Sequence, residues 1–219
     1  MNRLLRDNIS VFLAAERLVI GDPVISIVIP TRFREKHLNN CLDAIKSNSS
    51  IDHEVIIVRD ENKDRVGCAN AVNVGTHMCD TDIIVFIGND TLPQPGWDTN
   101  ALDCLAEFNN SIGMVGFNDT VTDYNEKPAP QHFMIHKEII KKLPNQKLFY
   151  NYHHNYCDVE LHHRVNEMGL YNMCDTAIIY HIHHMIAPEG HSPREPDECD
   201  LFAYENAGID MKVCQSRIG

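Results

Sequence analysis

The run of residues 83–87 constrains the fold of this 219-residue chain more than any other feature. It is a continuous apolar stretch, Ile-Ile-Val-Phe-Ile, followed shortly by Asn89, Asp90 and Thr91. Such a run predicts a central strand that is covered on both faces. Ligands of open α/β sheets bind just outside the carboxyl ends of the strands. Asp90 is therefore expected at a functional site, although an Asn-Asp pair is also a common turn.

Apolar runs and amphipathic segments alternate along most of the chain. The predicted strands cover residues 24–29, 54–58, 83–87, 112–117, 132–135 and 176–180. The predicted helices cover residues 38–45, 66–78, 97–108, 137–143 and 157–168. This alternation implies right-handed βαβ units. We therefore expect one α/β domain over residues 1–219, with a mostly parallel, twisted sheet flanked by helices.

The two ends of the chain carry weaker signals. Residues 1–20 fit an amphipathic helix better than a signal peptide or a membrane span, because charged residues such as Glu16 and Arg17 interrupt the apolar ones. Residues 186–219 contain several prolines near their start and have weak periodicity. We treat both segments as accessory to the core.

Charge and cysteine content limit the function classes. The formal net charge of −12 argues against nucleic acid or an anionic membrane as the main partner. The eight cysteines are scattered without CxxC pairs, which favours a reducing, cytoplasmic location over a disulfide framework. The glycine-rich motifs that bind dinucleotides or nucleoside triphosphates are absent. Phosphate binding would then depend on a metal ion.

Carboxylates and histidines at the ends of predicted elements are the candidates for chemistry. Asp60 follows the second predicted strand, where a solvated turn is an equally good interpretation. Asp158 and Glu160 open the 157–168 helix, where the helix dipole alone also favours acidic residues. His181 and His183 follow the last strand and share one side of it, so they could bind a divalent ion. Most of the other late histidines are predicted to lie on the surface.

Six segments in order resemble the family 2 glycosyltransferases of the GT-A fold, which use nucleotide-activated sugars. The resemblance covers about residues 24–185. The matching segments are Ser26 to Arg32, Val55 to Asp60, Asn73-Val74-Gly75, Asp82 to Thr91 with Gly96-Trp97, Cys157 to Leu161, and Tyr180-His181.

The resemblance implies transfer of a sugar from a nucleoside-diphosphate sugar to a glycan or another hydroxyl acceptor, with inversion. It implies Mn²⁺ or Mg²⁺ as cofactor, held by Asp90 with His181 and His183. Asp158 would be the catalytic base and Glu160 a second candidate. The implied donor-binding residues are Pro30, Thr31, Arg32, Asp60, Asn73, Asn89 and Asp90.

Two positions depart from the family pattern. Gly88-Asn89-Asp90 stands where the family has a DxD motif, so only Asp90 remains to bind metal directly. Cys157 stands where an acidic residue is usual. These departures leave two alternatives open: a non-catalytic module that binds nucleotide-sugar or carbohydrate, and a metal-dependent hydrolase built around the C-terminal histidines.

Overall fold

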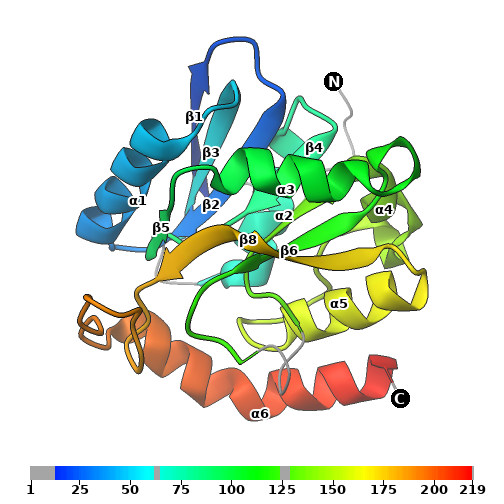
Figure 1. Ribbon diagram of the computed structural model, residues 1–219. Helices are drawn as coiled ribbons and strands as arrows, with labels where there is room; N and C mark the ends of the chain where they lie inside the picture. The colour runs from blue at the N-terminus through cyan, green and yellow to red at the C-terminus, as the bar shows by residue number, and fades with distance from the viewer. Residues whose placement is uncertain (1–12, 62–64, 124–128, 219) are drawn as a thin grey trace.

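A computed structural model describes residues 13–61, 65–123 and 129–218. Within these residues a mixed eight-stranded sheet is flanked by helices on both faces (Figure 1). The strands are β1 (Ala14–Ile20), β2 (Ile25–Thr31), β3 (His53–Arg59), β4 (Ile83–Phe86), β5 (Thr91–Pro93), β6 (Met114–Asn118), β7 (Phe133–His136) and β8 (Tyr171–His181). The helices are α1 (Glu35–Asn48), α2 (Cys68–Met78), α3 (Trp97–Ala106), α4 (Lys137–Lys142), α5 (Cys157–Glu167) and α6 (Glu198–Ile218). Two short 3₁₀ turns, η2 (Asn109–Ser111) and η3 (Pro144–Gln146), complete the list.

The strand order is β1-β3-β2-β4-β7-β6-β8-β5. Neighbours are parallel in the pairs β2–β3, β2–β4 and β6–β8, and antiparallel in the other four pairs. The prediction of a mostly parallel sheet was therefore wrong, although the α/β class is confirmed. Strands β2, β3 and β4 are parallel, and they come from the first half of the chain, where the sequence shows regular βαβ alternation. The irregular second half inserts β7 antiparallel between β4 and β6.

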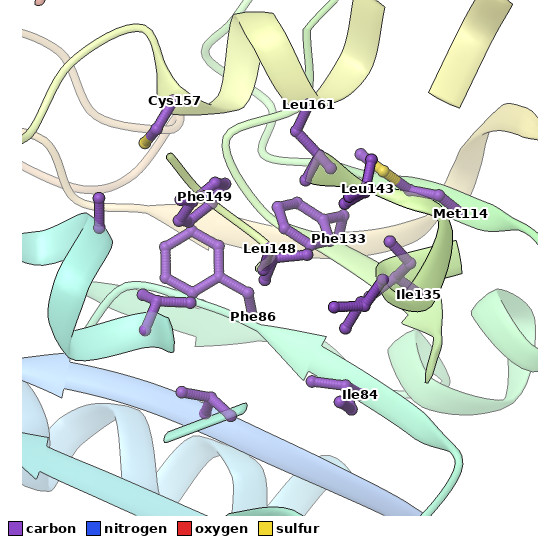
Figure 2. Close-up of a cluster of buried hydrophobic side chains, with 14 of the residues drawn as sticks. Ile84, Phe86, Met114, Phe133, Ile135, Leu143, Leu148, Phe149, Cys157 and Leu161 are labelled. Atoms are coloured by element: carbon purple, nitrogen blue, oxygen red, sulfur yellow. The ribbon is translucent and has the colours of Figure 1, made fainter. Parts of the chain in front are cut away.

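Strand side chains are buried on both faces of the sheet. On one face Ile25, Ile27 and Ile29 pack with α1 and α3. On the other face Ile84 and Phe86 pack with α2, α4 and α5. Figure 2 shows part of this cluster, including Cys157 and Leu161 of α5. The rings of Phe86 and Phe133 lie 5.5 Å apart between centroids, in the range of favourable aromatic pairs. This double core fixes the carboxyl end of β4, where Asn89 and Asp90 follow.

The amino-terminal helix prediction was wrong for residues 14–20, and residues 1–12 lie outside the described part. Residues 14–20 form β1, which pairs antiparallel with β3 at the edge of the sheet. All seven residues of β1 are exposed. Main-chain pairing with β3, together with the strand preference of Leu18-Val19-Ile20, therefore outweighs the short helical pattern.

The carboxyl-terminal segment, predicted as an irregular tail, contains the 21-residue helix α6, which runs beside α5 along the lower edge of the molecule (Figure 1). Its buried residues are Asp200, Asp210 and Cys214. Asp210 accepts main-chain N–H groups from three consecutive residues, 153–155, at 2.9–3.0 Å. The helix therefore docks through carboxylates, which explains the missing apolar periodicity. Among the described residues, no helix has the length and apolar character needed to cross a membrane.

Candidate active site

A cavity of about 610 Å³ lies at the carboxyl ends of β2, β3, β4 and β8. The starts of α2 and α5 and the first turns of α6 also line it. Nine of the residues singled out from the sequence line it: Pro30, Thr31, Arg32, Asp60, Asn89, Asp90, Asp158, His181 and His183. Two others, Asn73 and Glu160, are not among its lining residues. The strand-end rule thus brings together the positions that the sequence suggested.

Asp60 orders the loop that leads into α2. Its carboxylate accepts the main-chain N–H groups of Val66 at 3.1 Å and Gly67 at 3.0 Å. Gly67 has a φ of +83°, and a Cβ there would lie 2.2 Å from the carbonyl oxygen of His153. Only glycine therefore lets the loops before α2 and α5 meet at the cavity. Asp60 is buried, and its Oδ1 lies 3.9 Å from Arg32 Nη1. Its side chain is therefore fixed by contacts within the protein rather than exposed to solvent in a turn.

Two polar residues of the cavity floor bind each other. The side-chain amide of Asn89 donates to Thr31 Oγ1 at 2.7 Å, and both residues are buried. This bond joins the ends of β2 and β4. Asn73, on α2, instead forms two hydrogen bonds with the main chain of Phe149, at 2.8 and 3.0 Å.

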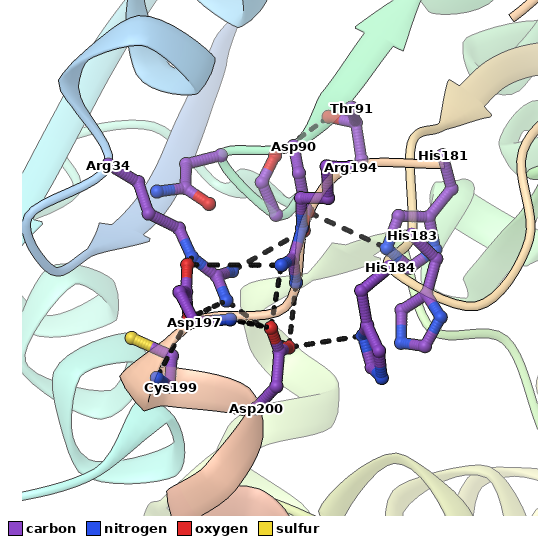
Figure 3. A network of polar contacts seen from close by, with 12 residues as sticks. Arg34, Asp90, Thr91, His181, His183, His184, Arg194, Asp197, Cys199 and Asp200 are labelled. Carbon is purple, nitrogen blue, oxygen red and sulfur yellow. Dashed lines mark hydrogen bonds and ion pairs between the residues drawn. The ribbon is translucent and has the colours of Figure 1, made fainter. Parts of the chain in front are cut away.

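Asp90 contacts three cationic or titratable side chains (Figure 3). Its Oδ2 accepts a hydrogen bond from Arg194 Nε at 3.0 Å and lies 3.4 Å from Arg34 Nη1. Its Oδ1 lies 3.5 Å from His181 Nε2. Burial disfavours the charge on Asp90, but His181, Arg34 and Arg194 outweigh it and hold the pKa of this carboxyl well below its usual range. Asp90 is therefore an ionised carboxylate.

Arg194 comes from the segment that the sequence left without an assignment. Its Nη1 and Nη2 donate to Asp200 at 2.6 and 2.7 Å. Arg34 in turn binds Asp197 through Nε and Nη2, at 2.6 and 2.8 Å. These paired contacts fasten residues 194–200 next to Asp90. No motif or periodicity marks Arg194, and 104 positions separate it from Asp90.

The histidines near β8 form a partly buried group. The rings of His181 and His183 lie 5.3 Å apart, and those of His181 and His132 lie 4.8 Å apart. His132 departs from the surface position predicted for most of the other histidines, since only 4% of it is exposed. The N–H of Gly88 donates to its Nδ1 at 3.2 Å. Burial lowers the pKa of His132 to about 3, so its ring is neutral.

The types of side chain at Asp90 and His181 are ones that bind divalent ions. A carboxylate and an imidazole are suitable ligands, and His181 Nδ1 is buried without a hydrogen-bond partner. However, Oδ2 of Asp90 is engaged by Arg194. Over residues 13–61, 65–123 and 129–218, no three His, Cys, Asp or Glu side chains are grouped as a metal site would require. Asp90 and His181 are therefore a pair of candidate ligands rather than a complete protein site.

Asp158 lies in the first turn of α5, on the cavity wall. It is half-buried, and burial raises the pKa of its carboxyl to about 6, against the opposing effect of the N–H groups of residues 158 and 159. A proton acceptor with a pKa in this range works well near neutral pH. Asp158 is therefore a potential general base on the wall of the cavity.

Comparison with solved structures shows what this architecture resembles. A mannosyltransferase from Pyrobaculum calidifontis, in complex with GDP-Man and Mn²⁺, superposes with a TM-score of 0.64 at 15% identity, over 90% of this chain and 65% of that one. The glucosyl-3-phosphoglycerate synthase of Mycobacterium tuberculosis, with Mn²⁺, UDP-glucose and phosphoglyceric acid, gives 0.62 at 15% identity, over 90% and 80%. The chain has the GT-A fold.

TarS of S. aureus shares the GT-A fold, with a TM-score of 0.57 at 11% identity, over 72% of this chain and 60% of that one. The chain thus spans roughly two thirds or less of the first and third of these structures. No protein-family model matches the sequence, and no curated protein matches it. At these identities the GT-A fold is what the comparisons establish.

Proposed function

We propose that this protein is a glycosyltransferase that moves a sugar from a nucleoside-diphosphate sugar to an acceptor hydroxyl, with inversion at the anomeric carbon. One observation carries the proposal: Asp158, with its pKa raised to about 6, lies on the same cavity as the strand-end residues Asp60 and Asp90. The cavity volume of about 610 Å³ is in the range of small-molecule sites. Solved proteins of this fold hold GDP-Man or UDP-glucose.

Asp158 would act as the general base. Its carboxylate accepts the proton of the acceptor hydroxyl while that oxygen forms a bond to the anomeric carbon. The bond between this carbon and the diphosphate oxygen breaks, and the nucleoside diphosphate leaves with the electron pair. A single displacement of this kind inverts the configuration. Glu160, which does not line the cavity, is better suited to a structural role.

The ends of β2, β3 and β4 would bind the donor. Asp60 and Arg32 are held at the end of β3 and β2 by their mutual contact, which suits a nucleoside wall. Pro30, Thr31 and Asn89 continue this wall to β4. Asn73 would act indirectly, by fixing the main chain of Phe149 against α2.

Mn²⁺ or Mg²⁺ would be held by Asp90 and His181, with His183 as a further candidate from the neighbouring ring position. A bound divalent ion neutralises the charge that develops on the leaving diphosphate. Such a cation would also let a chain of net charge −12 bind a dianionic donor.

Thermal-shift measurements with UDP, GDP, UDP-glucose and GDP-mannose, each with EDTA or with Mn²⁺, test the donor class. A ligand that binds only the folded state raises its stability by about 2.7 kcal/mol at a hundred times its Kd. The donor that stabilises the protein is then incubated with candidate acceptors, and released nucleoside diphosphate is measured. Asp158→Asn is the matched variant, since it keeps the shape of the side chain and cannot take up the proton.

The outcomes separate the candidate functions. Release that depends on the acceptor and is lost in Asp158→Asn supports the glycosyltransferase. Stabilisation by a donor with no release under any acceptor would indicate the non-catalytic binding module. Equal release with and without acceptor would indicate a hydrolase. A protein that no nucleoside diphosphate stabilises would refute the proposal.

A further inference from the structure

Arg194 binds the carboxylate of Asp90, the residue that the proposed function assigns to Mn²⁺ or Mg²⁺. Its Nε donates to Asp90 Oδ2 at 3.0 Å, and only 4% of its side chain is exposed. Arg194 belongs to the C-terminal arm (residues 186–197), which connects β8 to α6 and lies beside the strand ends (Figures 1 and 3). The guanidinium therefore lies against one of the two oxygens by which Asp90 could bind a divalent ion, while the other, Oδ1, lies 3.5 Å from His181.

Each nitrogen of Arg194 already donates within the protein. Nη1 donates to Asp200 and to the carbonyl of Glu195, and Nη2 donates to Asp200. With Nε on Asp90, the guanidinium joins two buried carboxylates. A guanidinium prepared to bind phosphate would present donors to the cavity. This one is arranged as a counterion for carboxylates.

We propose that Arg194 is an internal counterion that closes the metal position at Asp90, and that a divalent ion binds there only by displacing it. The inference rests on the proposed function, since it concerns the regulation of the same site. Arg194 and a divalent ion would compete for Oδ2 of Asp90. While Arg194 donates to this oxygen, a metal ion cannot bind there.

The displacement needs little rearrangement of the fold. Arg194 keeps two hydrogen bonds to Asp200 when it leaves Asp90, so it remains attached to the first turn of α6. Arg34 holds Asp197 by two further bonds. The C-terminal arm can therefore release Asp90 without detaching from α1 or α6. Metal binding would in this way be coupled to the position of the arm.

The test measures Mn²⁺ binding alone, without nucleotide, by the electron paramagnetic resonance signal of free Mn²⁺. A charge-assisted hydrogen bond in a buried site is worth about 1.5–3 kcal/mol, and every 1.4 kcal/mol is tenfold in affinity. Arg194→Met should therefore bind Mn²⁺ about ten- to a hundredfold more tightly than the wild type. Asp90→Asn in the Arg194→Met background should abolish that gain.

Arg17→Met is the matched control. It removes the same charge from a site near the amino end of β4, where Arg17 pairs with Glu54 and Asp80. It should leave Mn²⁺ affinity within about twofold of the wild type. Arg194→Lys keeps the charge but cannot bridge Asp90 and Asp200 in the same way. It should fold even if Arg194→Met does not, and should bind Mn²⁺ with intermediate affinity.

Unchanged or weaker Mn²⁺ binding in both Arg194 variants would overturn the inference. So would metal-free binding of UDP or GDP that Arg194→Met abolishes, because Arg194 would then be a phosphate ligand. Failure of the proposed function is read separately, as the absence of nucleoside-diphosphate binding in the wild type. The Mn²⁺ titration does not depend on that result.

Discussion

Asp158 and Glu160 lie two residues apart on α5, and their carboxyl groups meet different surroundings. Asp158 lies on the cavity wall, where burial raises its pKa to about 6. Glu160 is buried on the side of α6 and accepts hydrogen bonds from Tyr152, Arg164 and Arg217 at 2.6–2.9 Å. Burial also penalises its charge, but these donors, Arg217 foremost, lower its pKa.

The difference shows that hydrogen-bond donors, rather than burial alone, decide whether the pKa of each carboxyl is raised or lowered. Two residues on a helix are about 200° apart around its axis, so one side chain can face the cavity while the other faces α6. Glu160 has a fixed set of donors and little tendency to take up a proton. No cationic side chain offsets the effect of burial on Asp158, so its carboxyl is mostly ionised at pH 7 and takes up a proton as the pH falls through about 6. The resemblance to the GT-A family made them the first and second candidates for the same role.

The largest expected contrast is in turnover. Asp158→Asn should lower kcat by about 10²–10⁴-fold, because general-base catalysis contributes that range. Donor affinity should stay near wild type, since the amide keeps the size of the side chain. Initial rates at saturating donor, with thermal shifts for binding, measure both quantities. Wild-type kcat in Asp158→Asn would show that the base lies elsewhere on the cavity.

Glu160→Gln should act on stability and leave turnover per folded molecule near wild type. The change leaves Arg164 and Arg217, both partly exposed, without their buried anion. We expect a loss of about 1–3 kcal/mol in the free energy of unfolding, below the full cost of breaking a buried pair because water reaches both arginines. Urea denaturation measures it.

Glu138→Gln serves as the control for this loss. Glu138 pairs with Lys141 on the exposed side of α4. Its replacement should leave the urea midpoint unchanged, as expected for surface pairs. If Glu160→Gln is as stable as wild type but inactive, the contrast between the two carboxylates is reversed.

The pH dependence of kcat/KM should report Asp158. Because burial raises the pKa of this carboxyl to about 6, the ionised base is lost as the pH falls below that value. The acid limb should have its midpoint near pH 6, with about a tenfold loss at pH 5. The residual activity of Asp158→Asn should lack this limb. A wild-type midpoint near pH 4 would mean that the base is an unperturbed carboxyl.

The smallest expected effect is a gain in stability. The pKa of Asp158 is raised in the folded state above about 3.9, the value of an unfolded Asp, so ionisation costs stability as the pH rises from about 4 through 6. Asp158→Asn removes that cost. It should stabilise the protein by about 1 kcal/mol at pH 8, allowing for partial solvation, and not at all at pH 4. Urea denaturation at both pH values checks the sign.

The floor of the cavity could be predicted from the sequence because one rule sufficed for it. The end of a buried strand can be located in the sequence, because a run of apolar, β-branched residues gives way to polar ones. Parallel strands bring those ends to one edge of the sheet. Asp60 and Asp90 follow from that rule, whereas Thr31 was implied by the family resemblance. The same rule cannot tell which way a helical side chain points, so Asn73 and Glu160 were placed at the site and lie outside its lining.

The C-terminal cover could not be predicted, for a different physical reason. A helix that docks by an apolar stripe leaves a periodic signal. α6 docks by Asp200 and Asp210, and its exposed residues include apolar side chains such as Leu201 and Ile209. Arg194 likewise depends on a partner distant in sequence. Polar docking of this kind leaves no pattern in a single sequence.

The way Asp210 holds the loop before α5 affects how substrate specificity can change. Its carboxylate binds the main chain of residues 153–155, and every residue except proline supplies a main-chain N–H group. His154, Asn155 and Tyr156 line the cavity from this loop. Under the proposed function, substitutions at these positions would alter which acceptor fits, while Asp210 would keep α5 and Asp158 in place. Acceptor choice could then change at these positions without rebuilding the surroundings of the proposed base.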